Sequence, residues 1–386
     1  MASSYQPVRT PYVLSDQEIA ATALHKIVLD TQAGEKVPPH ETTTHSPISA
    51  FVRNYIPRPS LEEFEESWHL GNYVVDRHTG EKSFENMSIG VRLGMHFLYY
   101  GPFHQTALKW ERVREILAYQ TRQMGNAYDS AASKAHIEPF IKSFHLQESL
   151  SDLVEPDPNR YATFNQFFAR ELKPSARPIA DPDDSSVISS PADCRLMVFP
   201  TVDMATKYWI KGYGFTLGKL LQGDVLASQF DGGSVTIARL APQDYHRWHS
   251  PVDGTISSIK EIPGTYFTVN PQAINQPGSL DVFCENRRSV MLIRRKSPHL
   301  SIALVAVGAM LVGSIKYNPG IQQGAEVTRG QCLGAFQYGG STVIVLIPRG
   351  DFIPDADLVD NSMGHRCETL VKMGWKIGRS PVPFRP

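Results

Sequence analysis

The pattern of apolar and polar residues divides the chain into three parts. Residues 1–50 are polar and rich in Thr and Pro, with little periodicity, so we expect a flexible leader. Residues 51–172 carry the spacing of amphipathic helices, which predicts a helical N-terminal region with its apolar faces in a core. Two apolar stripes show this spacing, one of Trp110, Val113, Ile116 and Leu117 and one of Ile137, Phe140, Ile141 and Phe144.

Two further features belong to the helical region. Thr163 and Gln166 have the spacing of a capping box directly before an aromatic run, so a helix is predicted to begin at Thr163. Residues 91–103 are apolar and aromatic. Core packing is the simpler interpretation of residues 91–103, and contact with a membrane surface is the alternative.

From residue 173 to residue 386, short β-type runs alternate with Gly and Pro. This pattern predicts a mainly antiparallel, barrel- or sandwich-like β domain, and therefore an α+β fold with the helical region packed on that domain. A charge-free run between Lys296 and Lys316 approaches the length of a membrane span, but its glycines and β-branched residues favour two buried strands. The predicted strands are Ser234–Leu240, Met291–Arg294, Ile302–Val307, Met310–Ile315 and Thr342–Ile347.

A weak internal repeat lies within the β-rich part. The segments Ser190–Leu196 and Ser250–Ile256 share the pattern Ser-Pro-x-Asp-x-x-apolar. Two equivalent turns that lead into strands would produce this repeat, and coincidence is the alternative.

Composition and charge narrow the classes of function. Lys and Arg number 38 and Asp and Glu number 39, so net charge gives no case for binding nucleic acid or an anionic membrane surface. The four cysteines contain no CxxC spacing, which argues against a zinc knuckle or a thioredoxin-like motif and suits a reducing compartment. The N-terminal residues lack the pattern of a signal peptide, so we expect a cytoplasmic location.

Two histidines, His246 and His249, form an H-x-x-H pair. Pro242 and Pro251 argue against a helix there, and on a strand residues three apart point to opposite faces. We therefore predict no metal site, and we interpret the pair as one reactive histidine with a structural neighbour. Spacing alone leaves open which carboxylate would orient such a histidine, and the candidates are Asp193, Asp244 and Asp253.

A glycine pair precedes Ser341. The hydrolase signature G-x-S-x-G fails here because residue 343 is Val, so a glycine turn that leads into a strand is the simpler interpretation. The alternative is a chemical role for the pair. Because Gly340 has no side chain, its carbonyl is open to attack, and the hydroxyl of Ser341 lies one residue beyond that carbonyl.

Five segments occur in a characteristic order along the chain. They are Phe164–Pro178 (FNQFFARELKPSARP), Ser190–Asp193 (SPAD), Leu240–Gly254 (LAPQDYHRWHSPVDG), Val307–Ser314 (VGAMLVGS) and Leu333–Thr342 (LGAFQYGGST). Together they resemble the phosphatidylserine decarboxylases, over about residues 75–380. The large fungal and plant members carry calcium-dependent lipid-binding modules upstream, and we expect this chain to be a fungal-type form without them.

The resemblance implies a proenzyme that cleaves itself between Gly340 and Ser341. In that chemistry Ser341 attacks the Gly340 carbonyl, the resulting ester undergoes β-elimination, and residue 341 becomes a covalent pyruvoyl cofactor that forms a Schiff base with the substrate. The resemblance assigns His249 as the base and Asp193 as the residue that orients it. It gives His246 a substrate-binding or structural role.

The implied reaction converts phosphatidylserine to phosphatidylethanolamine and CO₂, with the enzyme peripheral on an endomembrane and composed of a large and a small chain. Two alternatives stay open. His-Arg-Trp-His also occurs in a fungal offshoot that decarboxylates free tryptophan, so a free amino acid or a specialised metabolite is a second substrate class. A non-cleaving lipid-binding homologue is the third reading. Sequence does not fix the oligomeric state, for which a homodimer is one option.

Overall fold

The computed structural model describes residues 71–86, 125–210, 214–266, 281–296, 300–308, 314–337 and 341–381. The predicted leader at 1–50, the segment 91–103 and the apolar stripe at 110–117 lie outside these ranges. Within them, no helix is long and apolar enough to cross a membrane.

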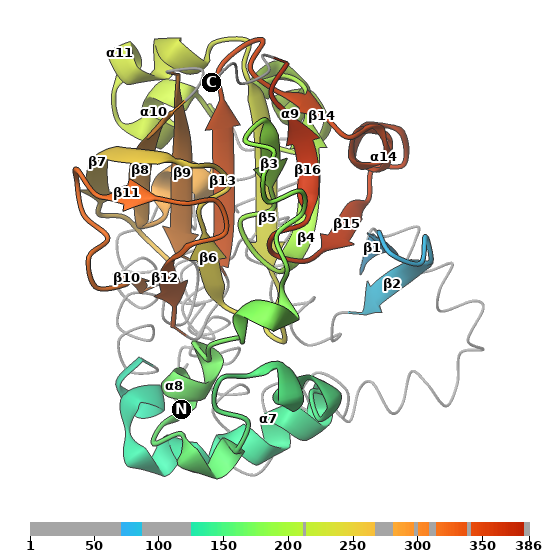
Figure 1. Cartoon of the computed structure of the whole chain (residues 1–386), viewed down its shortest axis with the longest axis vertical. Coiled ribbons are helices and arrows are strands. Elements are labelled where there is room, and N and C mark those ends of the chain that lie inside the picture. The colour runs from blue at the N-terminus through green and yellow to red at the C-terminus, as the bar shows by residue number, and fades with distance from the viewer. Residues whose placement is uncertain are drawn as a thin grey trace, which may run out of the picture.

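A ten-stranded, mostly antiparallel sheet dominates the fold (Figure 1). Among the described strands, the parallel pairing is that of β1 (Gly71–Asp76) with β15 (Glu368–Val371), and the other pairs in this sheet are antiparallel. Buried β-branched and aliphatic residues fill the central strands, as expected for strands covered on both faces. In spatial order the strands are β11 (Glu326–Val327), β7 (Gly254–Ile262), β8 (Arg288–Arg295), β9 (Ser301–Gly308), β13 (Ser341–Ile347), β5 (Ser234–Leu240), β4 (Cys194–Phe199), β15 (Glu368–Val371), β1 (Gly71–Asp76) and β2 (Lys82–Asn86).

Two three-stranded sheets accompany the large one. The first contains β10 (Ile315–Tyr317), β12 (Cys332–Phe336) and β6 (Arg247–His249), and the second contains β14 (Ile353–Pro354), β16 (Lys376–Arg379) and β3 (Val187–Ser189). Residues of all three sheets share one apolar cluster, which includes Trp248, Val343 and Ile377. The small sheets therefore pack on the large one and are part of its core.

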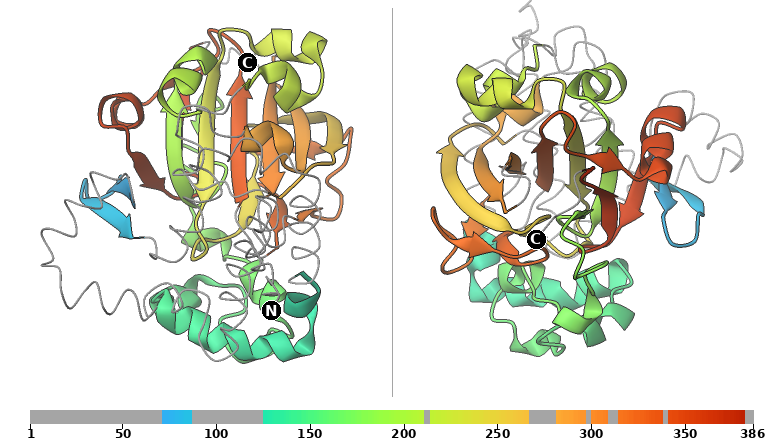
Figure 2. Two further views of the ribbon diagram at one scale, coloured as in Figure 1. Left: turned by 180° about the vertical axis from the view of Figure 1, so that it is seen from behind. Right: turned by 45° about the horizontal axis from the view of Figure 1, so that its top comes forward.

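Short helices lie at the two ends of the large sheet. Figures 1 and 2 show α7 and α8 below one end, and α10 and α11 at the opposite end. The first group is η2 (Ala131–His136), α7 (Ile137–Ser143), η3 (Glu148–Asp152), η4 (Pro158–Arg160), α8 (Phe164–Phe168) and η5 (Pro174–Ala176). The others are α9 (Val202–Tyr208), α10 (Leu217–Leu221), α11 (Asp224–Ala227), η6 (Ser228–Phe230), α13 (Val282–Glu285), α14 (Ala356–Val359) and η7 (Asp360–Gly364).

The predicted helix start at Thr163 is confirmed. The Thr163 hydroxyl accepts a hydrogen bond from the main-chain N–H of Gln166 at 3.2 Å, and α8 begins at the next residue. The Gln166 side chain accepts a hydrogen bond from Ala162. The phenyl rings of α8 pack with Ile137, Phe140 and Ile141 of α7 in a separate aromatic core. A cap and an aromatic core thus fix α8 against the end of the large sheet.

The α+β class is confirmed, but the barrel-like expectation needs correction. The described strands form an open sheet, with β11 at one edge and β2 at the other. Strand Ser234–Leu240 is β5 as predicted, and the predictions near 291, 302 and 342 fall within β8, β9 and β13. Most of the predicted strand Met310–Ile315 lies outside the described residues, and β10 begins at its last residue.

Candidate active site

Ser341 is the first residue of β13, in the middle of the large sheet. It pairs with Leu240 of β5 on one side and with Gly308 of β9 on the other. Its side chain is fully buried, and within the described residues its Oγ has no hydrogen-bond partner. Buried hydroxyls are nearly always hydrogen-bonded, so an unpartnered one calls for a chemical explanation. Gly340 lies outside the described residues.

His249 ends β6 and is buried. Its main-chain N–H donates to the carbonyl of Pro191 at 2.8 Å, and its Nε2 lies 3.5 Å from the hydroxyl of Tyr245. Its Nδ1 is buried and has no partner within the described ranges. Burial lowers the pKa of His249 to about 4, although the charge of Asp193 acts in the opposite direction. At neutral pH this imidazole is uncharged and able to accept a proton.

His246 directly precedes β6, the short strand that His249 ends. Its Nδ1 is 2.9 Å from the main-chain carbonyl of Asp244, and its ring stacks on Phe168 of α8 with 3.9 Å between centroids. Burial lowers the pKa of His246 to about 3, so the ring is neutral. In the described part of the chain, no three His, Cys, Asp or Glu side chains gather as metal ligands would. His246 therefore links the helical region to the strand that carries His249.

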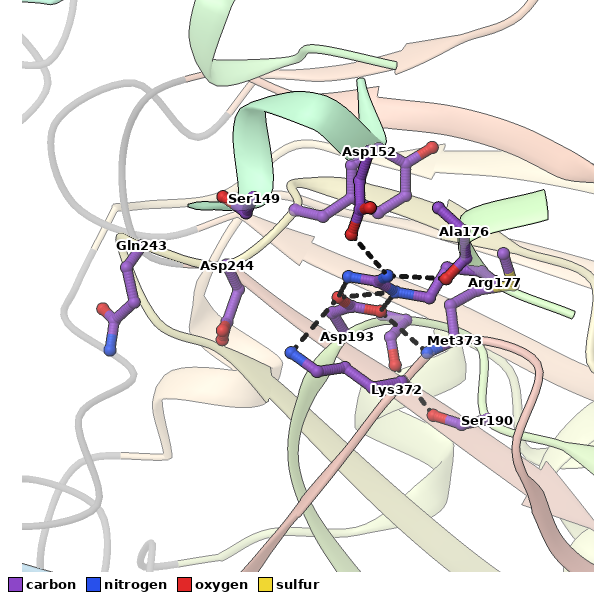
Figure 3. A network of polar contacts seen from close by, with 12 residues as sticks. Ser149, Asp152, Ala176, Arg177, Ser190, Asp193, Gln243, Asp244, Lys372 and Met373 are labelled. Atoms are coloured by element: carbon purple, nitrogen blue, oxygen red, sulfur yellow. Dashed lines mark hydrogen bonds and ion pairs between the residues drawn. The ribbon is translucent and has the colours of Figure 1, made fainter. Parts of the chain in front are cut away.

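Asp193 stands in the turn before β4, with its carboxylate buried (Figure 3). Arg177 donates to it from Nε at 3.0 and 3.1 Å and from Nη2 at 2.7 Å. The main-chain N–H of Met373 donates to it at 2.8 Å, and the Lys372 ammonium lies 3.6 Å away. Burial acts to raise the pKa of Asp193, but the hydrogen bonds from Arg177 and the charges of Lys372 and Arg177 outweigh it and lower the pKa.

Asp193 is therefore an ionised carboxylate whose hydrogen-bonding capacity is directed to Arg177 and Met373. The described contacts contain no hydrogen bond between Asp193 and the ring of His249, and the two residues interact through charge. Their proximity comes from the backbone, because the turn that contains Asp193 accepts the N–H of His249 at Pro191. That Asp193 orients His249 stays a prediction.

The two segments of the internal repeat form equivalent turns, as the repeat predicted. In each, the serine hydroxyl donates to the carbonyl two residues later, at 2.8 Å for Ser190 and 2.6 Å for Ser250. In each, the aspartate accepts a main-chain N–H at 2.8 Å from a residue that precedes a left-handed glycine. These N–H groups belong to Met373 for Asp193 and to Arg329 for Asp253.

The two turns also bond to each other in a reciprocal way. Ser189, before the first turn, donates its N–H to the carbonyl of Pro251 at 3.1 Å, while His249, before the second turn, donates to Pro191 at 2.8 Å. This exchange places one predicted site residue, Asp193, in the first turn and another, His249, at the start of the second. The repeat in the sequence is thus the framework of the candidate site.

The other two candidate carboxylates have different partners. Asp244 forms a buried ion pair with Arg195 and accepts the N–H of Ala241 at 2.8 Å. Asp253 accepts the N–H of Arg329. No hydrogen bond joins either carboxylate to a histidine ring within the described residues. The ring of His246 is hydrogen-bonded to the main-chain carbonyl of Asp244 and not to its carboxylate. The spacing of side chains in the sequence could not predict this main-chain contact.

Sequence reasoning missed Arg177 and Tyr245 as members of the site. Both residues lie within the segments on which the family resemblance rests. That position is the feature of the sequence that could have identified them. Trp248 stands between the two histidines and is fully buried in the core against Tyr317, Phe336 and Gly334. Its described contacts are those of a residue packed in the core.

Comparison with known protein families gives a match to the model described as phosphatidylserine decarboxylase, over residues 164–379. Phosphatidylserine decarboxylase proenzyme 3 of Schizosaccharomyces pombe is 44% identical over 313 residues, which are 81% of this chain and 31% of that protein. Proenzyme 2 of Komagataella phaffii is 42% identical over 80% of this chain and 30% of its own length. The proenzyme of Fusobacterium nucleatum is 35% identical over 79% of this chain and 96% of its own. This chain thus spans about a third of those fungal relatives and nearly all of the bacterial one.

Proposed function

This chain belongs to the phosphatidylserine decarboxylase family, and we propose that it is a self-processing proenzyme that decarboxylates phosphatidylserine to phosphatidylethanolamine. The relatives named above are called phosphatidylserine decarboxylase proenzymes, which supports both the reaction and the processing. The observation that carries the proposal is that Ser341 Oγ and His249 Nδ1, two reactive atoms, are buried and have no hydrogen-bond partner among the described residues.

Self-processing is the chemistry that suits these two atoms. A serine hydroxyl is a weak nucleophile at neutral pH and requires a base. His249 is neutral and has an unpartnered Nδ1, so it fits the role of the base that takes the proton of Ser341. Ser341 Oγ then forms an ester with the Gly340 carbonyl carbon as the Gly340–Ser341 peptide bond breaks.

In the next step, the bond between Cβ and Oγ of residue 341 breaks. β-Elimination releases residues 1–340 with a C-terminal carboxylate and leaves a dehydroalanine at residue 341. Water then converts the dehydroalanine to a pyruvoyl group and ammonia. Asp193, held ionised by Arg177, supplies the negative charge that stabilises a protonated His249.

Residue 341 fits a pyruvoyl group because its side chain is fully buried and its Oγ makes no hydrogen bond within the described residues that the conversion would break. Such a group supplies a ketone that binds the amine of the substrate and accepts the electron pair left by departing CO₂. Among the described residues, His249 and His246 are two neutral side chains that could move protons during the reaction. Tyr245 limits the freedom of the His249 ring through its contact at Nε2.

We place the enzyme at the cytoplasmic surface of an endomembrane as a peripheral protein, because its substrate is a membrane lipid. With nearly balanced charge overall, it would depend on apolar contact for membrane association, and residues 91–103 are the candidate segment.

Mass analysis under denaturing conditions tests the self-processing. We expect a large piece of residues 1–340 and a small piece of residues 341–386 whose N-terminus is blocked. Ser341→Ala should remain one intact chain. A wild-type protein that also stays intact would contradict the proposal and favour the non-cleaving homologue. CO₂ release from phosphatidylserine in mixed micelles, compared with free amino acids including tryptophan, tests the substrate.

A further inference from the structure

A cavity of about 750 Å³ lies between the segment around α8 and the small sheet of β6, β10 and β12. Arg170 and Thr163 line it from one side, and Arg247, Lys316 and Gln337 line it from the other. In Figure 1 the arrow of β13 starts at the end of the large sheet that faces α8. Gln337 precedes Ser341 by four residues, which span at most about 13 Å. One wall of the cavity therefore lies within about 13 Å of Ser341 along the chain.

The charged groups of this cavity do not balance one another. Its three carboxylates all have partners within the described residues, whereas no described carboxylate pairs with the cations Arg170 and Lys316. The partners are Asn165 for Asp129 at 2.9 Å, Arg160 for Glu155 at 3.5 Å, and Arg247 for Glu171 at 2.8 Å. Because Asn165 is neutral, the charge of Asp129 offsets one of these two cations, and one net positive charge remains to attract an anion.

Arg170 is the more informative of these two cations because it is buried. Its Nη2 donates to the main-chain carbonyls of Gln243 at 3.0 Å and Asp244 at 3.3 Å, and its Nη1 is buried without a partner in the described structure. Burial lowers the pKa of Arg170, and the charge of Asp244 offsets this in part. A buried cation with an unused donor is costly unless an anion completes its environment.

The backbone connects Arg170 to the reaction site. The Asp244 carbonyl that accepts from Arg170 also meets Nδ1 of His246 at 2.9 Å. The same connection leaves β5 at Leu240, which pairs with Ser341. A ligand oxygen at Arg170 would therefore lie near a substrate whose amine is held at residue 341.

We infer that this cavity binds the phosphodiester of the substrate head group and that Arg170 is its buried anchor, with Lys316 at the rim. The inference rests on the proposed function. The substrate has a second anion, its carboxylate, but an arginine that stabilised the departing carboxylate would stabilise the ground state and oppose decarboxylation. The phosphodiester keeps its charge throughout the reaction, so binding it costs nothing at the transition state.

Calorimetry on the purified full chain tests this inference with three soluble probes. Glycerophosphoethanolamine carries the phosphodiester and no carboxylate, L-serine carries the carboxylate and no phosphodiester, and ethanolamine carries neither. A charged hydrogen bond implies that the wild-type chain binds glycerophosphoethanolamine about tenfold or more tighter than ethanolamine. Arg170→Gln should reduce this preference to about twofold or less, and Arg170→Lys should retain part of it.

Lys142→Gln is the matched control. It removes one positive charge from the helical region, and Lys142 is exposed and is absent from the cavity wall. We expect it to keep the wild-type preference. If Arg170→Gln fails to fold, Lys316→Gln provides the second variant, since Lys316 is exposed and its loss should weaken glycerophosphoethanolamine binding several-fold without affecting ethanolamine.

Two results would overturn the inference: an unchanged preference in the folded variants, or a loss confined to the affinity for L-serine, which would assign Arg170 to the carboxylate. Failure of the proposed function gives a different result. A chain that stays intact and releases no CO₂ contradicts that function whatever the calorimetry shows. A chain that is processed and active, but whose probe preference survives Arg170→Gln, contradicts only the phosphodiester site.

Discussion

Arg177 and Asp193 form a bidentate, buried ion pair, with Nη2 of the arginine 2.7 Å from the carboxylate. The same carboxylate is predicted to support His249, whose ring it influences through charge. Bidentate arginine–carboxylate pairs fix geometry as well as charge. We therefore regard Arg177 as a positioning residue for the processing reaction.

Arg177→Gln should slow self-cleavage and make it depend on pH. Without the arginine, burial raises the pKa of Asp193, so part of the population holds a neutral acid at pH 7 that cannot stabilise a protonated His249. We expect a rate loss of about tenfold or more at pH 6, recovered as the pH rises. The cleaved fraction after cell-free synthesis, followed from pH 6 to 8.5, measures this. Arg177→Lys should recover part of the rate, and a uniform loss at every pH would indicate a purely structural role.

The wild-type chain should process at a nearly constant rate from about pH 8 down to about pH 5. The base must be neutral to take the Ser341 proton, and the pKa of His249 is lowered to about 4, so the rate should fall only as the pH approaches 4. The same cell-free assay at lower pH checks the profile. A midpoint near 6.5, the ordinary value for histidine, would show that His249 is not the base in its buried setting.

The two buried histidines should make the fold sensitive to acid. Their pKa values are about 3 for His246 and about 4 for His249, both below the unfolded value of about 6.5. The unfolded chain therefore binds protons first, and the free energy of unfolding should decrease as the pH falls from about 6.5 to about 4. Urea unfolding of the Ser341→Ala chain at several pH values measures this slope. His246→Gln removes one titrating group and should flatten it, so an unchanged slope would contradict the assignment.

Trp248→Phe should affect stability and leave substrate preference unchanged. Trp248 is fully buried among Tyr317, Phe336 and Gly334, so the smaller ring leaves a cavity worth about 1–3 kcal/mol of unfolding free energy. Urea unfolding measures the cost, and CO₂ release from phosphatidylserine micelles and from free tryptophan measures the preference. A switch toward or away from tryptophan would show that this residue selects the substrate.

Gly334→Ala should destabilise the small sheet beneath the site. A Cβ at Gly334 would lie 2.3 Å from the carbonyl oxygen of Lys316 and 3.1 Å from the Trp248 ring, and main chain cannot move aside cheaply. We expect a loss of about 1–3 kcal/mol in urea unfolding. Gly364→Ala is the control, because a Cβ there meets nothing within 4 Å. Equal effects of the two substitutions would contradict this packing.

Local rules predicted several elements of the fold, because capping and strand patterns act over a few residues, but they missed β1 and β2, which lie in the region predicted to be helical and join the large sheet. Thr163 caps α8, and Ser234–Leu240 forms β5, as their sequences indicated. The strand pattern left a barrel and a sandwich open and did not show that the described strands form an open sheet, since alternation within strands says nothing about which strands lie at its edges. In the site, spacing left three carboxylates open because the deciding contacts are long-range. Arg177 donates to the Asp193 carboxylate from 16 residues before it along the chain. The N–H of Met373 donates to the same carboxylate from 180 residues after it.

The position of Ser341 in the sheet has a consequence for folding. Residues 341–379 supply β13, β14, β15 and β16, and β13 lies between β9 and β5, which precede the proposed cut. Before the Gly340–Ser341 bond is cut, folding is a unimolecular reaction of one chain. After the cut, folding requires two chains to associate. The melting temperature of the processed protein should then rise with protein concentration, whereas that of Ser341→Ala should not. After processing, unfolding in dilute solution would separate the two chains, and refolding would require them to meet again.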